Sequence, residues 1–95
     1  MKAIALILLL TVVSCGVSKK KLSKDGMKVK ILDRKGSNCS TVDKVVGENE
    51  MDSEELATNH ARNLAAKSGG NAIVVDEVVD NGGVVKVYAT AYRCN

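Results

Sequence analysis

The fold is decided by residues 71–94, whose sequence is Asn71-Ala-Ile-Val-Val-Asp-Glu-Val-Val-Asp-Asn-Gly-Gly-Val-Val-Lys-Val-Tyr-Ala-Thr-Ala-Tyr-Arg-Cys94. Val, Ile, Thr and Tyr dominate this stretch, and such residues favour strands. The segment Asp80-Asn81-Gly82-Gly83 divides it, and Asn-Gly is typical of a tight hairpin because both residues tolerate positive φ. The sequence therefore predicts two strands over 71–79 and 84–94, joined by a turn.

The second of these strands has two different faces. Successive side chains of a strand point to opposite sides of the sheet. One set is apolar and is expected to face the core, namely Val85, Val87, Ala89 and Ala91. The other set is more polar and is expected to face outward, namely Lys86, Tyr88, Thr90 and Tyr92.

A helix is predicted just before this hairpin, over residues 53–68. Asp52 with Glu55 three residues later fits a capping box, and Ser53 is the alternative N-cap. Gly69 is a natural left-handed C-cap. At 100° per residue one face collects Leu56, Ala57, Ala61, Leu64 and Ala65. Because this face is mostly Ala, the helix is expected to lie close to a sheet.

Two further strands are predicted before the helix, over 27–32 and 39–46, with a turn-rich segment over 33–38. In the first, Met27, Val29 and Ile31 are expected to point inward. The two strands are expected to form an antiparallel pair, the second ending at Gly47. The predicted fold is α+β, a single domain over 27–95 in ββαββ order, with one helix on one face of a small antiparallel or mixed sheet.

The beginning of the chain has the pattern of an export signal. Lys2 precedes an apolar run over 3–13, and Val12-Val13-Ser14-Cys15 ends it. This ending resembles the lipobox of bacterial lipoproteins. The resemblance implies a signal peptide over 1–14, cleavage before Cys15, a diacylglyceryl group on the Cys15 thiol and an acylated amine. The alternatives are a soluble secreted protein and a transmembrane helix, although about 11 apolar residues are far fewer than the roughly 20 that span a bilayer.

The expected location is the cell envelope. In enteric-type bacteria an Asp after the lipidated Cys usually retains a lipoprotein in the inner membrane, and Gly16 follows here. The prediction is therefore the periplasmic face of the outer membrane, with the membrane bound through the lipid. Residues 15–26 are expected to be the lipidated Cys and a flexible basic tether, with four Lys against one Asp.

Two cysteines, Cys39 and Cys94, remain in the domain. In an oxidising compartment two cysteines usually form one disulfide. A metal site that includes His60 and a redox pair are the alternatives, although neither Cys belongs to a Cys-x-x-Cys motif.

Several activities are not supported by the sequence. From Ile31 onward there are seven Lys/Arg against ten Asp/Glu, so a nucleic-acid role is not expected. The acidic segment 48–52 lacks the Gly and the final acid of a calcium loop. No nucleophile–base set is recognisable, and the chain has one His. We therefore expect no enzyme, no cofactor and no bound metal. For His60 the choice is between a partly packed boundary residue and a pH sensor.

The lipobox, the segment Asn63-x-Ala65-x-x-x-Gly69-Gly70-Asn71-Ala72 and the closing Ala91-Tyr-Arg-Cys94 together resemble a family of small bacterial lipoproteins of unknown function. That family is related in fold to RcsF, an outer-membrane lipoprotein that reports envelope damage. The resemblance implies the same fold and supports a Cys39–Cys94 disulfide.

The expected function is a non-enzymatic, membrane-anchored interaction or sensor module. Tyr88 and Tyr92 are the candidate contacts with another envelope protein. The alternative is a periplasmic ligand- or metal-binding lipoprotein using His60 and the acidic loop.

Overall fold

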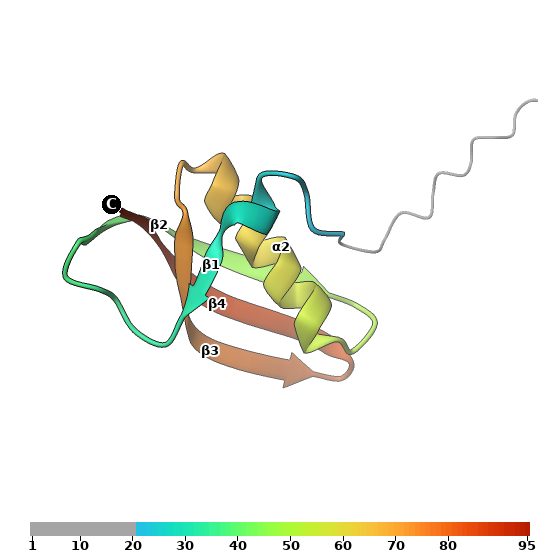
Figure 1. Cartoon of the computed structure of the whole chain (residues 1–95). Coiled ribbons are helices and arrows are strands. Elements are labelled where there is room, and N and C mark those ends of the chain that lie inside the picture. Colours follow the sequence, from blue (N-terminus) through green and yellow to red (C-terminus); the bar gives the residue numbers. More distant parts are fainter. Residues whose placement is uncertain (1–20) are drawn as a thin grey trace, which may run out of the picture.

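The computed structural model describes residues 21–95, so the predicted signal peptide, Cys15 and residues 16–20 lie outside the described part. A 3-10 turn, η3 (Gly26–Lys28), precedes strand β1 (Lys30–Leu32). Next come strand β2 (Cys39–Asn49) and helix α2 (Glu54–Lys67), and strands β3 (Ala72–Asn81) and β4 (Val84–Cys94) end the domain. Figure 1 shows α2 lying across one face of the sheet. The predicted α+β class and ββαββ order are confirmed.

The sheet is mixed and has four strands in the order β1-β3-β4-β2. β3 and β4 form the central antiparallel hairpin, β2 is antiparallel to β4, and β1 is parallel to β3. The predicted antiparallel pairing of the first two strands is wrong, because β1 and β2 lie at opposite edges. The physical reason is that the β3–β4 hairpin is the most apolar pair of strands and occupies the centre of the sheet. β1 and β2 then pair with its two outer edges. The segment 33–38 is therefore a crossover instead of a hairpin turn.

The first strand is shorter than predicted. Its expected beginning is folded into η3, and only three residues pair with β3. Val29 is buried at 1% exposure, whereas Met27 and Ile31 are 62% and 52% exposed. The predicted inward positions are thus correct for Val29 and wrong for the other two. Alternation fails at Met27 because a 3-10 turn replaces the extended backbone that alternation requires. Ile31 does lie in β1, but β1 is an edge strand, and Ile31 remains exposed beside Glu55 and Arg62 of α2.

Helix α2 begins and ends close to the predicted residues. The Ser53 hydroxyl accepts a hydrogen bond from the Leu56 amide at 3.1 Å, so Ser53 is the N-cap and the Asp52 alternative is wrong. Gly69 follows the helix with φ +94°, as a left-handed C-cap requires. Three alanines, Ala57, Ala61 and Ala65, are completely buried against the sheet, and Leu56 and Leu64 are half-buried beside them.

The helix comes very close to strand β2 at Gly47. A Cβ atom at Gly47 would overlap the Ala57 carbonyl oxygen and lie 2.6 Å from the Ala61 amide nitrogen. Only glycine leaves room for helix backbone at this position. β2 therefore continues through Gly47 to Asn49, beyond the predicted end of the strand.

The hairpin and the two faces of β4 follow the prediction, but the turn lies one residue later than the Asn81-Gly82 pair that indicated it, because Asn81 belongs to β3 and has no positive φ. The turn consists of Gly82 and Gly83, with φ values of +64° and +93°, which suit a two-residue turn with both φ positive. On β4 the apolar set is buried under the helix side of the sheet, and its members are Val85, Val87, Ala89 and Ala91. A bulge interrupts the β3–β4 register between Val75 and Glu77, and another interrupts β2–β4 between Thr41 and Asp43.

Candidate functional site

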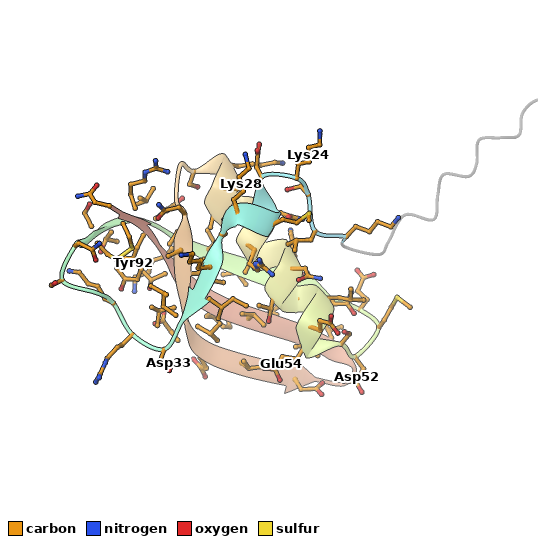
Figure 2. The ribbon with its side chains drawn as sticks, viewed as in Figure 1. Lys24, Lys28, Asp33, Asp52, Glu54 and Tyr92 are labelled. Carbon is orange, nitrogen blue, oxygen red and sulfur yellow. A yellow bond between two sulfur atoms is a disulfide. The ribbon has the colours of Figure 1, made fainter. Side chains whose placement is uncertain are left out.

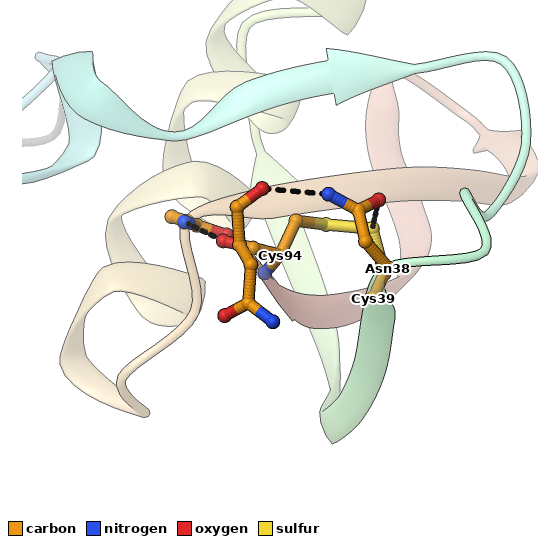
Figure 3. Close-up of a disulfide and its surroundings, with 5 residues drawn as sticks. Asn38, Cys39 and Cys94 are labelled. Atoms are coloured by element: carbon orange, nitrogen blue, oxygen red, sulfur yellow. Dashed lines mark hydrogen bonds between the residues drawn. A yellow bond between two sulfur atoms is a disulfide. The ribbon is translucent and has the colours of Figure 1, made fainter.

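The predicted disulfide is present. Cys39 and Cys94 are bonded across the β2–β4 pair, where they are directly opposite each other with their Cα atoms 4.0 Å apart (Figure 3). They are 55 residues apart in sequence. Closing a loop of this size stabilises a fold by about 4 kcal/mol in the chain-entropy model. Because both sulfurs are bonded to each other, neither is available as a thiolate ligand.

The strand end beside the disulfide is held by two asparagines. The Asn71 side chain donates to the Cys94 carbonyl and accepts from the Cys94 amide, both at 2.8 Å. The Asn38 side chain donates to the Asn95 carbonyl at 2.6 Å, and the Asn95 amide donates to the Asn38 carbonyl at 3.2 Å. Together these bonds continue the pairing of β4 beyond its last ladder position.

The segment singled out over 63–72 has structural roles throughout. Asn63 accepts from the Ser23 amide at 2.8 Å and donates to the Lys21 carbonyl at 2.8 Å. Arg62 donates to the Val29 carbonyl at 3.0 Å. Helix α2 therefore holds residues 21–29 by side-chain hydrogen bonds. A flexible tether was expected over 16–26, but its described part, 21–26, is attached to the helix.

The face of the sheet opposite α2 carries the two predicted tyrosines. Tyr88 is 37% exposed and lies directly opposite Val46, which is 40% exposed. Tyr92 lies four residues further along β4, on the same face, and is half-buried. Thr90 stands between the tyrosines and donates to the Asp76 carboxylate at 2.7 Å. An exposed aromatic–aliphatic pair thus sits on the outer face, beside a fixed polar pair.

The side chain of His60, on helix α2, lies against strand β2. Its Nδ1 atom accepts a hydrogen bond from the Glu48 amide at 2.9 Å. The Lys44 amide on the same strand bonds to the Asp43 carboxylate at 2.8 Å. Edge strands normally expose such amides to other chains. The side chains of Asp43 and His60 therefore accept hydrogen bonds from two backbone amides of β2. The sequence does not indicate this role for either residue.

Acidic side chains gather near the beginning of α2. Figure 2 shows Asp52 and Glu54 at one end of the helix and Lys28 near the other. A hydrogen bond with the Asp80 side chain raises the pKa of the Asp52 carboxyl, and the charge of Asp80 raises it further. Glu48 forms an ion pair with Lys86, with 3.8 Å between the charged atoms. Over residues 21–95, no three His, Cys, Asp or Glu side chains are grouped as metal ligands.

Basic side chains lie at the opposite end, around the disulfide. Lys28, Lys30 and Arg34 line a depression there together with Asn38 and Asn71. The sequence placed its basic excess in the tether and did not indicate this grouping. The three cations lie within seven residues of each other in the sequence, but no local pattern predicts that the neighbouring ends of β3 and β4 complete the depression beside them.

The chain matches no protein-family model, no curated protein and no solved structure. Within the described residues, no helix has both the length and the hydropathy needed to cross a membrane. Fold and site define a two-layer α+β domain with a helix on one sheet face, an exposed opposite face and a disulfide between β2 and β4.

Proposed function

We propose that this protein is a non-enzymatic lipoprotein of the cell envelope whose domain binds another envelope protein through the sheet face opposite α2. The observation that carries the proposal is the exposed pair of Val46 and Tyr88 on that face. Helix α2 covers the other face of the sheet. Within residues 21–95, no helix or strand covers the face that carries Val46 and Tyr88. Aromatic residues are enriched where proteins bind each other.

The surroundings of this pair suit an interface. Lys86 and Glu48 flank it with an ion pair, which supplies a polar rim. The hydrogen bond between Thr90 and Asp76 holds the other side of the surface in one arrangement. A prearranged surface loses less conformational entropy when it binds.

The anchor part of the proposal rests on the lipobox at Cys15. Asn63 holds the chain from Lys21 onward, so only residues 16–20 separate the expected lipid from the domain. Six residue steps of extended chain span at most about 20 Å. A partner would therefore meet the domain close to the membrane surface. The resemblance to small bacterial lipoproteins supports the anchored location in this proposal.

In-cell photocrosslinking tests the proposal. A photoreactive amino acid replaces Val46 or Tyr88 in separate variants, and Lys67, which is exposed on α2, serves as the matched control position. Both sheet positions should give the same discrete crosslinked protein, and Lys67 should not. Equal patterns of neighbours from all three positions would refute binding through this face.

A further inference from the structure

A depression of about 470 Å³ lies beside the disulfide. The β1 strand and the crossover segment 33–38 form one side, and the ends of β3 and β4 form the other. Leu32, Ala72 and Cys39 provide apolar surface in it, and Ala72 and Cys39 are buried at 2% and 8% exposure. The disulfide and the Asn71 hydrogen bonds to Cys94 fix one wall.

The charged side chains around this depression are all cations, and the chain end at Asn95 also lines it. Lys28, Lys30 and Arg34 come from three successive elements, namely η3, β1 and the crossover segment. No Asp or Glu lines the depression, and within residues 21–95 none of the three cations forms an ion pair. Asp33 precedes Arg34 in the chain but is not part of the lining.

The two asparagines that line the depression, Asn38 and Asn71, are neutral. The side chains of Asn38 and Asn71 are already hydrogen-bonded to the backbone of Asn95 and Cys94. Three cationic side chains with no acidic side chain in the lining favour a small anion with several oxygens. An Arg guanidinium can bind two oxygens of a phosphate at once, and Lys adds a mobile point charge.

We propose that this depression binds a phosphate group carried by a phosphomonoester or a phosphodiester. The phosphate can belong to a phospholipid headgroup or to a soluble compound. The headgroup alternative rests on the lipid anchor proposed above. The proposal does not depend on the protein partner proposed above, because the Val46–Tyr88 surface contributes nothing to the lining.

The test uses ¹⁵N-labelled full-length lipidated protein in dodecyl maltoside micelles, which contain no phosphate. In one arm inorganic phosphate is titrated at constant ionic strength, and in the other phosphatidylglycerol is added to the micelles. The backbone amides of Lys30 and Arg34 should shift saturably in at least one arm. A response to phosphatidylglycerol alone assigns the headgroup, and a response to phosphate alone assigns a soluble compound.

Charge removal completes the test. Each lost cation should weaken binding roughly tenfold, since hydrogen bonds to charged groups have that magnitude. The Lys30→Gln/Arg34→Gln double variant should therefore lose saturable binding. Both side chains are exposed, so its melting temperature should match that of the wild type. Lys44→Gln, whose side chain is exposed on β2 and does not line the depression, should bind as the wild type does. Absence of saturable shifts in both arms, or unchanged binding by the double variant, would overturn the proposal.

Discussion

Gly47 of β2 lies against the backbone of helix α2 at Ala61, closer than any residue with a side chain permits. At this position the backbones of β2 and α2 are therefore in direct contact. Around it, three fully buried alanines keep the helix low over the sheet. With no Phe or Trp in the chain, this close approach of backbones takes the place of bulky core side chains.

The first prediction concerns this contact. Gly47→Ala should destabilise the domain by about 1–3 kcal/mol, because overpacking forces the backbone apart. Urea unfolding measures the change. Val46→Ala, one residue away and 40% exposed, is the matched control and should change stability by less than about 0.5 kcal/mol. Equal small effects for both variants would show that the helix can move without cost.

The second prediction concerns the disulfide. Cys94→Ser should lower the melting temperature by well over ten degrees, at about 4–8 °C per kcal/mol for a domain of this size. Cys39→Ser should have the same effect and the double variant no larger one, because each removes the same bond. Calorimetry and thiol alkylation of non-reduced protein check this. Unequal, additive losses would indicate separate roles for the two cysteines.

The third prediction concerns Asn71. Asn71→Ala removes a donor and an acceptor from the Cys94 backbone, and should cost about 1–3 kcal/mol. Amide exchange at Cys94 should accelerate in this variant. Asn71→Asp keeps the acceptor and loses the donor, so it should protect the Cys94 amide better than Asn71→Ala. Identical exchange in both variants would contradict the two-bond arrangement.

The fourth prediction concerns pH. The folded state holds the Asp52 proton more tightly than the unfolded chain, because Asp80 raises the Asp52 pKa. This contribution to stability is complete below about pH 4, the ordinary range for Asp, and is lost as pH rises through the raised pKa. Asp52→Asn should therefore raise the melting temperature more at pH 7 than at pH 3. Glu50→Gln, which is exposed nearby on the same loop, should show no such difference. A pH-independent change in Asp52→Asn would rule out the carboxyl pair as its cause.

The fifth prediction concerns the anchor. Cys15→Ser should abolish incorporation of a clickable fatty acid and leave the precursor unprocessed or cut elsewhere. Cys39→Ser is the control, since it removes a cysteine without affecting the lipobox. Label retained by the Cys15→Ser protein would overturn the assignment of the lipidated residue.

Local patterns predicted most of the secondary structure. Helix α2, the β3–β4 hairpin and the two faces of β4 follow from periodicity and turn residues, which act over a few positions. The partners of β1 and β2 did not follow from the sequence. Pairing between distant strands depends on how the whole sheet buries its apolar face, and the turn residues at 33–38 suit a crossover as well as a hairpin.

The site shows the same division. Tyr88 and Tyr92 were placed on the correct face because alternation fixes it. The hydrogen bond from Glu48 to His60 was not foreseen, since it joins a strand to a helix through one ring nitrogen. The cations of the basic depression are neighbours in the sequence, but its other wall comes from Asn71 and Cys94, and that pairing depends on the whole sheet.

The hydrogen bonds of Asn63 to Ser23 and Lys21 determine where a pulling force would enter the domain. In the proposed anchored protein, tension at the N-terminal side would act first on this contact and then on the short β1 strand. When the opposing force acts at the chain end beyond Cys94, the Cys39–Cys94 bond carries the load past the residues between these two cysteines. Under that load the described domain would lengthen only by releasing residues 21–38. The extension of the described domain is thus limited to these 18 residues, while the helix and the strands between the two cysteines keep their shape.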